Sequence, residues 1–89
     1  MEVLYRKLFL KDLKKLKNQP IYEQIVELAF TVLPRYKQLR DVPDVKVMRR
    51  YPKRYRIRVG NYRIEIEVKD NIAEIMRVLH RKEFYRYFP

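Results

Sequence analysis

Residues 54–68 read RYRIRVGNYRIEIEV, and this stretch decides the fold. Apolar residues alternate with charged ones on both sides of Gly60-Asn61, at Tyr55, Ile57, Val59, Tyr62, Ile64, Ile66 and Val68. Alternation with a period of two around a two-residue Gly-Asn link predicts an antiparallel β-hairpin. Gly60 can take the positive φ that a tight hairpin turn requires, and Asn61 tolerates it better than most residues.

The register of this hairpin follows if Gly60 and Asn61 alone form its turn. Arg58 then lies opposite Arg63, and the other facing pairs are Val59–Tyr62, Ile57–Ile64, Arg56–Glu65 and Arg54–Glu67. All charged residues share one face of the hairpin. Because like charges directly opposite each other destabilise a sheet, the pair Arg58–Arg63 favours a surface that binds an anion, and phosphate suits guanidinium groups best. The alternative is a solvated basic face whose long side chains bend apart.

The composition limits the chemistry that this chain can perform. The 89 residues, 47% of them hydrophobic, predict a single domain (1–89) with one modest core. The chain has no Ser, no Cys, one Gly and one His, which excludes a Ser or Cys nucleophile and a glycine-rich nucleotide loop. We expect neither a metal nor a cofactor, since one His and scattered carboxylates give no ligand cluster. Arg, Lys, Tyr, His80 and a few carboxylates remain, and they suit RNA, a substrate that brings its own 2′-hydroxyl nucleophile.

Positive charge is concentrated in the second half of the chain. The net charge is +11, of which residues 1–45 carry +3 and residues 46–89 carry +8. A basic half of this kind indicates a nucleic acid or another polyanion as partner. No apolar run is long enough to span a membrane and no signal-peptide pattern is present, so we expect no membrane association and a cytoplasmic location.

The first half of the sequence predicts one strand and two helices. Residues 1–9 are expected to form a mostly buried strand. Residues 10–17 place Leu at every third position among lysines, which predicts a short amphipathic helix. Residues 21–33 predict a second helix with two apolar stripes, one of them partly covered by the first helix in an αα-hairpin. Pro34 is expected to end it, and residues 35–53 to form a charged connector with a short extended piece at Val45 and Val47.

The second half predicts a three-stranded antiparallel meander and a helical tail. Residues 69–71 are expected to form a three-residue loop, which places Met76 and Val78 of the third strand (72–79) on the apolar face. The chain ends in HRKEFYRYFP, for which we expect a short helical turn with Phe84 and Phe88 facing the core or a partner. The predicted fold class is therefore α+β: an N-terminal strand, two helices, the meander and the tail.

Basic residues before and after the hairpin, together with its first residue, are candidates for RNA contact. A basic run leads into the hairpin at Lys46, Arg49, Arg50, Lys53 and Arg54. Near the end, Lys82 and Arg86 are interleaved with aromatic residues, a composition that binds phosphates and stacks on unpaired bases. For any one of the cations before the hairpin, a solvated loop is the default explanation, while together they extend the basic face. Tyr85 is the aromatic residue in the tail that we expect to take part in function.

The order of elements and two local motifs resemble the RelE/ParE toxin superfamily of type II toxin–antitoxin systems, and most closely its archaeal-type RelE toxins. The family pattern is a tyrosine-led basic strand, a Gly-(Asp/Asn)-Tyr-Arg turn and a late His-Arg-Lys-x-x-Tyr. These motifs stand here at residues 55–59, 60–63 and 80–85. Leu79 departs from the pattern, since the family often has Gly before the His-Arg pair. The resemblance implies a RelE-like microbial RNase fold.

The same resemblance implies a metal-independent, ribosome-dependent mRNA interferase that cuts mRNA in the ribosomal A site and is neutralised by a RelB-like antitoxin. Arg63 and Arg81 would stabilise the negative charge of the phosphorane, and Arg56 and Arg58 would occupy positions where some relatives carry lysine. Tyr85 would orient the substrate or transfer a proton. Because a guanidinium is a poor base, His80 is a further acid/base candidate, although a structural role for it is equally consistent. A gyrase-inhibiting ParE-like toxin and a non-catalytic RNA-binding domain are the alternatives.

Overall fold

The computed structural model describes residues 1–87. Five strands form one sheet in the order β1-β5-β4-β3-β2, with β1 parallel to β5 and the other neighbours antiparallel. The strands are β1 (Glu2–Tyr5), β2 (Val45–Met48), β3 (Tyr51–Val59), β4 (Tyr62–Lys69) and β5 (Ile72–His80). The helices are α1 (Lys7–Lys15), α2 (Tyr22–Glu27), the π-helical segment η1 (Leu28–Val32), α3 (Leu33–Arg35), the 3₁₀ turn η2 (Leu39–Asp41) and α4 (Arg81–Tyr87).

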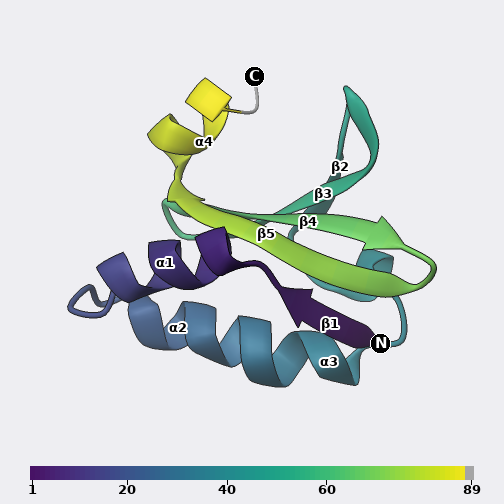
Figure 1. Cartoon of the computed structure of the whole chain (residues 1–89), viewed down its shortest axis with the longest axis horizontal. Helices are drawn as coiled ribbons and strands as arrows, with labels where there is room; N and C mark the ends of the chain where they lie inside the picture. Colours follow the sequence, from purple (N-terminus) through teal and green to yellow (C-terminus); the bar gives the residue numbers. More distant parts are fainter. Residues whose placement is uncertain (88–89) are drawn as a thin grey trace.

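The helices α1 to α3 cover one face of the sheet, while α4 and the β2–β3 hairpin project from the other side (Figure 1). The main core fills the space between the sheet and α1 to α3, and its fully buried side chains include Phe9, Ile25, Leu33, Ile64 and Ile66. The predicted α+β fold class is therefore confirmed. The two sides of the sheet differ, since one carries the core and the other carries the charged residues.

The β3–β4 hairpin has the register that the sequence predicts. Arg58 pairs with Arg63, and the pairs Arg54–Glu67, Arg56–Glu65, Ile57–Ile64 and Val59–Tyr62 are all present. Gly60 takes a φ of +57°, and Asn61 keeps a negative φ, as expected for a type II′ turn. The apolar residues of both strands consequently face the helices.

The turn between β4 and β5 differs from the predicted three-residue loop. Lys69 pairs directly with Ile72, so the loop is only Asp70-Asn71, and both residues have positive φ (52° and 62°). A two-residue loop alone would turn Arg77 toward the core. A β-bulge at Met76 removes this problem, because it shifts the register by one residue and places Arg77 opposite Glu65. Ile75 and Val78, rather than Met76 and Val78, therefore face the core.

The N-terminal segment also differs from the prediction. The strand ends at Tyr5 instead of Phe9, and it is half-exposed rather than mostly buried, because β1 lies at the edge of the sheet. The helix begins at Lys7, three residues earlier than expected, and Phe9 and Leu13 face the core while Leu10 is 45% exposed.

The second helix is longer and less regular than the periodicity predicts. The chain stays helical through Pro34 to Arg35, with the π-helical turn η1 directly before the proline. Proline lacks an N–H and crowds the carbonyl four residues earlier, which disturbs the regular hydrogen bonding of a helix. Phe30, from the second apolar stripe, stacks on Tyr5 at 4.4 Å between ring centroids and also meets Phe9 of α1. The predicted cover of this stripe by the first helix is thus partly confirmed.

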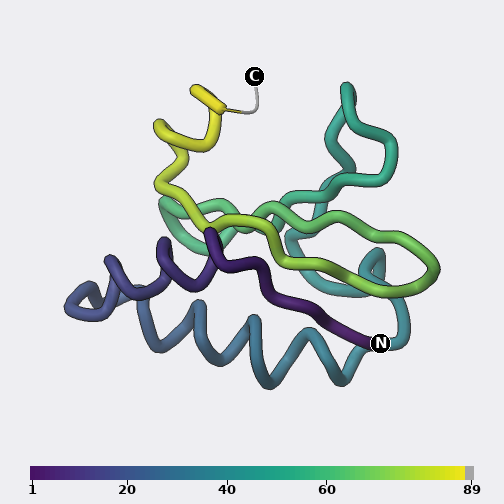
Figure 2. The backbone as a smooth tube through the Cα atoms, in the orientation of Figure 1, coloured from purple at the N-terminus to yellow at the C-terminus, as the bar shows by residue number. Residues whose placement is uncertain are grey.

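Residues 35–53 are more ordered than a connector. The expected extended piece at Val45 and Val47 is a true strand, β2, which pairs with β3 and adds a fourth strand to the predicted meander. At the other end of the segment, the Met1 amino group donates a hydrogen bond to the Pro34 carbonyl (3.2 Å), so the N-terminus lies beside the end of α3 (Figure 2).

Candidate active site

Three arginines of the hairpin and one tyrosine of α4 surround a common hollow on the charged face of the sheet. The hollow has a volume of about 340 Å³, and it is lined by Asp44, Lys46, Arg56, Arg58, Arg63 and Tyr85. We call it the arginine hollow. Adjacent strands present every second residue to the same face, which is why Arg56 and Arg58 of β3 meet Arg63 of β4. Four cations against one carboxylate make this hollow suited to an anion.

Arg63 is held rigidly at the base of the arginine hollow. Its side chain is 9% exposed, and its Nη1 donates hydrogen bonds to the carbonyl oxygens of Gly60 and Tyr62, both at 3.0 Å. Arg58, its cross-strand neighbour, is exposed and lies 3.9 Å from an Asp44 oxygen. The carbonyls and the carboxylate offset the repulsion of the like-charge pair, so the sheet tolerates two adjacent guanidinium groups.

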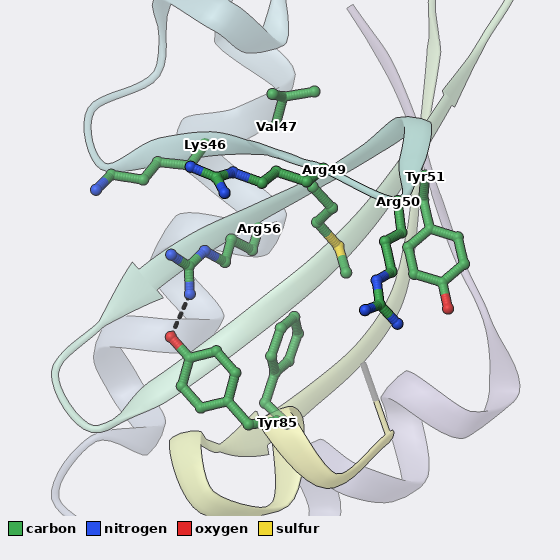
Figure 3. A pocket seen from close by; sticks show the side chains of 9 residues that line it. Lys46, Val47, Arg49, Arg50, Tyr51, Arg56 and Tyr85 are labelled. Carbon is green, nitrogen blue, oxygen red and sulfur yellow. Dashed lines mark hydrogen bonds between the residues drawn. The ribbon is translucent and has the colours of Figure 1, made fainter. Parts of the chain in front are cut away.

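Tyr85 reaches the arginine hollow from α4. The Arg56 Nη1 donates a hydrogen bond to the Tyr85 hydroxyl, and the guanidinium lies 5.6 Å from the centre of the tyrosine ring (Figure 3). This hydrogen bond lowers the pKa of Tyr85, and Arg63 acts in the same direction. The ring is 49% exposed, while its neighbour Phe84 is buried and anchors α4. Tyr85 is therefore an exposed hydroxyl whose deprotonated form is stabilised by cations.

Arg56 is free to face Tyr85 because its expected acidic partner is occupied elsewhere. Arg54, not Arg56, approaches Glu65 at 3.6 Å, and it also donates to Glu67 at 3.1 Å. Glu65 is fully buried, and within residues 1–87 neither of its carboxylate oxygens has a hydrogen-bond partner. Burial raises the pKa of Glu65 to about 7, although Arg54 opposes this shift. Both predicted facing pairs are thus present in the register, but Arg54 makes the ion pairs with Glu67 and Glu65, and Arg56 turns to Tyr85 instead.

Because the Glu65 carboxyl is buried, we expect the free energy of unfolding to depend on pH, and we expect Glu65→Gln to remove this dependence. Folding raises the pKa of Glu65 from 4.5 to about 7, so the folded protein keeps a proton that the unfolded chain releases in this range. The free energy of unfolding of the wild type will therefore fall as the pH rises from 4.5 through 7, by on the order of 3 kcal/mol relative to the variant. Urea denaturation of both proteins at several pH values measures this difference. Parallel curves for the two proteins would contradict the assignment.

The structure separates His80 and Arg81 from the arginine hollow. His80 lines a different hollow, of about 250 Å³, together with Asp12 and Arg77, and its Nδ1 accepts a hydrogen bond from the Lys82 N–H at 3.3 Å. Arg81 begins α4, and its backbone N–H donates to the Asn61 carbonyl at 2.7 Å. Its exposed side chain starts beside the Gly60-Asn61 turn but does not line the arginine hollow.

The predicted RNA-binding residues fall into three groups. Arg49 and Arg50 line a second, larger hollow between the β2–β3 hairpin and α4, which we call the hairpin hollow and which comprises residues 46–51, Arg56, Phe84 and Tyr85. Lys53 is exposed, while Arg54 turns toward the two glutamates. Lys82 and Arg86 are exposed on α4. Phe88, the other aromatic residue expected to face the core or a partner, lies outside the described residues.

Lys46 and Asp44 line the arginine hollow but were not assigned to it from the sequence. Lys46 was seen only as part of the basic run, and its place opposite Arg56 becomes evident once β2 is known to pair with β3. Asp44 has a φ of 63° in the turn before β2, and the dipeptide Pro43-Asp44 is a sequence signal for that turn. Within residues 1–87, no group of three His, Cys, Asp or Glu side chains could hold a metal ion. No helix in this part of the chain has the length and apolar character to cross a membrane.

Comparison with known proteins places the chain in a family. A sequence model described as "ParE toxin of type II toxin-antitoxin system, parDE" matches residues 3–85. The chain belongs to the RelE/ParE toxin family. This toxin is 42% identical over 90 residues to Toxin RelE3 of Methanocaldococcus jannaschii, and the match covers all of both chains.

Solved structures show the same relationship. The toxin matches the RelB-RelE antitoxin-toxin complex from Methanococcus jannaschii with a TM-score of 0.80 and 42% identity, over 97% of this chain and 99% of that one. It also matches the toxin-antitoxin complex RelBE2 from Mycobacterium tuberculosis with a TM-score of 0.69 and 30% identity, over 90% of this chain and 96% of that one. The RelE-like fold expected from the sequence motifs is thus confirmed.

Proposed function

We propose that this toxin is a ribosome-dependent mRNA endoribonuclease that inhibits translation by cutting mRNA in the ribosomal A site. The observation that carries the proposal is the arginine hollow, where Arg56, Arg58 and Arg63 converge with the Tyr85 hydroxyl. Positioned cations are the strongest means of stabilising charge that develops on a phosphoryl group. Membership of the RelE/ParE family supplies the cellular setting, a type II toxin–antitoxin system.

The proposed reaction needs only RNA and the side chains of this hollow. The 2′-hydroxyl attacks the adjacent phosphate, the bond to the 5′-oxygen breaks, and the products are a 2′,3′-cyclic phosphate and a 5′-hydroxyl. Arg63, fixed by two carbonyls, and Arg56 and Arg58 stabilise the extra negative charge of the phosphorane. One proton leaves the 2′-hydroxyl and one reaches the departing 5′-oxygen.

Tyr85 is the proposed proton-transfer group of the site. Its hydroxyl lies in the hollow, and the neighbouring arginines lower its pKa, which makes it a better base at neutral pH than an ordinary tyrosine. His80 lines a separate hollow together with Asp12 and Arg77, away from the arginine hollow. It therefore has no role in the proposed proton transfer. The family resemblance gives Arg81 the role of stabilising the phosphorane charge, and for this its exposed side chain, which starts beside the Gly60-Asn61 turn outside the hollow, has to turn toward the bound phosphate.

We further propose that a RelB-like antitoxin binds and neutralises this toxin in the cytoplasm. Two of the matching structures are complexes of related toxins with their antitoxins. An acidic segment of the antitoxin would be attracted to the arginine hollow, because four of its six lining residues are basic.

The second candidate function is inhibition of DNA gyrase, favoured by the ParE description of the matching family model. Primer extension on a translated message, with and without ribosomes, separates the two functions. The proposed nuclease gives truncated message that depends on ribosomes. Full-length message together with blocked supercoiling by gyrase would establish the second function and contradict the first.

A further inference from the structure

The hairpin hollow opens directly beside the arginine hollow and has no role in the proposed cleavage step. Its volume is about 550 Å³, within the range of roughly 300–1,000 Å³ typical of pockets that bind small organic ligands. The two hollows share Lys46, Arg56 and Tyr85, so whatever lies in one is adjacent to whatever lies in the other. The β2–β3 hairpin forms one wall and α4 the other (Figure 3).

The lining of the hairpin hollow combines cations with flat and apolar groups. Arg49 and Arg50, at the tip of the hairpin, supply two exposed guanidinium groups beyond the three shared residues. Tyr51, Met48 and Phe84 supply the apolar surface, and Met48 and Phe84 are 8% and 1% exposed. Among the described residues, no acidic side chain lines this hollow, whereas Asp44 lines the arginine hollow. A ligand that fits must therefore carry both a negative charge and a flat apolar part.

The Tyr51 ring is held in place before any ligand arrives. The Arg54 guanidinium lies 4.9 Å from the ring centre, and the Arg54 Nε is itself fixed by a hydrogen bond to Glu67 at 3.1 Å. Arg54 does not line the hollow, so it supports the ring from outside. An aromatic ring that is already ordered stacks on a ligand at a lower entropic cost.

We propose that the hairpin hollow binds the nucleotide next to the cleaved phosphate in the same RNA strand. Its base rests on Tyr51 and the apolar floor, and its outer phosphate binds Arg49 and Arg50. This inference rests on the proposed nuclease function, which places the cleaved phosphate in the adjacent hollow. The base must be unstacked to enter, which selects single-stranded RNA over a duplex.

The test is binding of a labelled trinucleotide that is 2′-O-methylated throughout and so cannot be cleaved, measured by fluorescence anisotropy. Replacing the base at one end by an abasic site, at each end in turn, shows which base the protein contacts. Four variants are compared with the wild type: Tyr51→Leu, Tyr51→Phe, Arg50→Ala and the control Arg35→Ala. Arg35 is exposed at the end of α3 and does not line the hollow, so its loss changes the net charge as Arg50→Ala does.

The expected result is that one abasic end weakens binding to the wild type by roughly tenfold, and that Tyr51→Leu weakens binding of the intact trinucleotide to a similar extent. Tyr51→Phe keeps the ring and should bind like the wild type. Arg50→Ala should lower the slope of log affinity against log salt by about 0.7, and Arg35→Ala should leave it unchanged.

Equal affinities of the intact and abasic trinucleotides, or wild-type binding by both Tyr51→Leu and Arg50→Ala, would overturn the inference. Thermal unfolding of each variant shows that a loss of affinity does not come from unfolding. The ribosome-dependent cleavage assay on the wild-type protein decides separately whether the nuclease function stands. Cleavage by the wild type with no effect of either substitution on trinucleotide binding would refute this subsite alone.

Discussion

Arg56→Ala will lower the rate of ribosome-dependent mRNA cleavage by about 100-fold or more. The substitution removes a guanidinium from the arginine hollow and also the hydrogen-bond donor to the Tyr85 hydroxyl. Loss of one donor aimed at the transition-state charge costs on the order of 10²-fold in rate, and here the pKa of Tyr85 rises as well. Single-turnover cleavage of a message bound to ribosomes measures the rate.

The matched control is Arg35→Ala, which removes the same charge from the exposed end of α3, on the opposite side of the sheet (Figure 1). It should cleave within a few-fold of the wild type, because non-specific attraction to RNA is spread over all 22 basic residues. Arg56→Ala should remain folded, since Arg56 lies at the surface and makes no buried ion pair among the described residues. Equal losses in the two variants would mean that overall charge, not the hollow, determines the rate.

Asp12→Ala will lower the free energy of unfolding by about 3 kcal/mol, because it breaks a buried ion pair. Asp12 is 6% exposed on α1 and accepts two hydrogen bonds from Arg77, at 2.9 and 3.1 Å. Its Oδ2 also accepts a hydrogen bond from the Val78 N–H at 3.2 Å. Val78 lies in the part of β5 that extends past the end of the neighbouring strand β1. Removing one partner of a buried ion pair leaves the other charge uncompensated, at a cost of roughly 3–5 kcal/mol when burial is complete.

Urea denaturation at constant pH measures this loss, with Glu27→Ala on the exposed side of α2 as the control for removing one carboxylate. The double variant Asp12→Leu/Arg77→Met should recover part of the stability, because it leaves no unpaired charge. Arg77 also lies 5.3 Å from the Tyr87 ring of α4, so Asp12→Ala should loosen this helix as well. A midpoint equal to that of the control would show that the pair contributes nothing.

The β3–β4 hairpin and its register could be predicted because strict alternation and the Gly60-Asn61 turn are local signals, independent of the rest of the chain. The β4–β5 connection could not be predicted in the same way. A two-residue turn followed by a bulge at Met76 keeps Arg77 off the core face, as the predicted three-residue loop would also have done. Alternation shows which residues share a face, but it does not show where one residue is left unpaired.

The candidate site was predicted in its parts but not in its arrangement. The basic strand and Tyr85 were identified from composition and motif, and the structure brings Arg56, Arg58, Arg63 and Tyr85 to one hollow. Alternation within β4 places Glu65 on the charged face, but it does not show that this carboxyl is buried there or that Arg54 approaches it. His80 lies on the other side of the sheet from the arginine hollow, because it ends β5 opposite Tyr62. The two rings make an edge contact there, with 5.4 Å between their centroids.

The proposed mechanism requires fixed guanidinium groups to stabilise a phosphodiester while the RNA attacks itself. The most direct test replaces the 2′-hydroxyl next to the cleaved phosphate by hydrogen in a message programmed into the ribosomal A site. The proposed mechanism predicts that this single deoxy position abolishes cleavage there, while the all-ribose message yields a 2′,3′-cyclic phosphate and a 5′-hydroxyl. Cleavage of the deoxy message at the same phosphate and at an undiminished rate would contradict it.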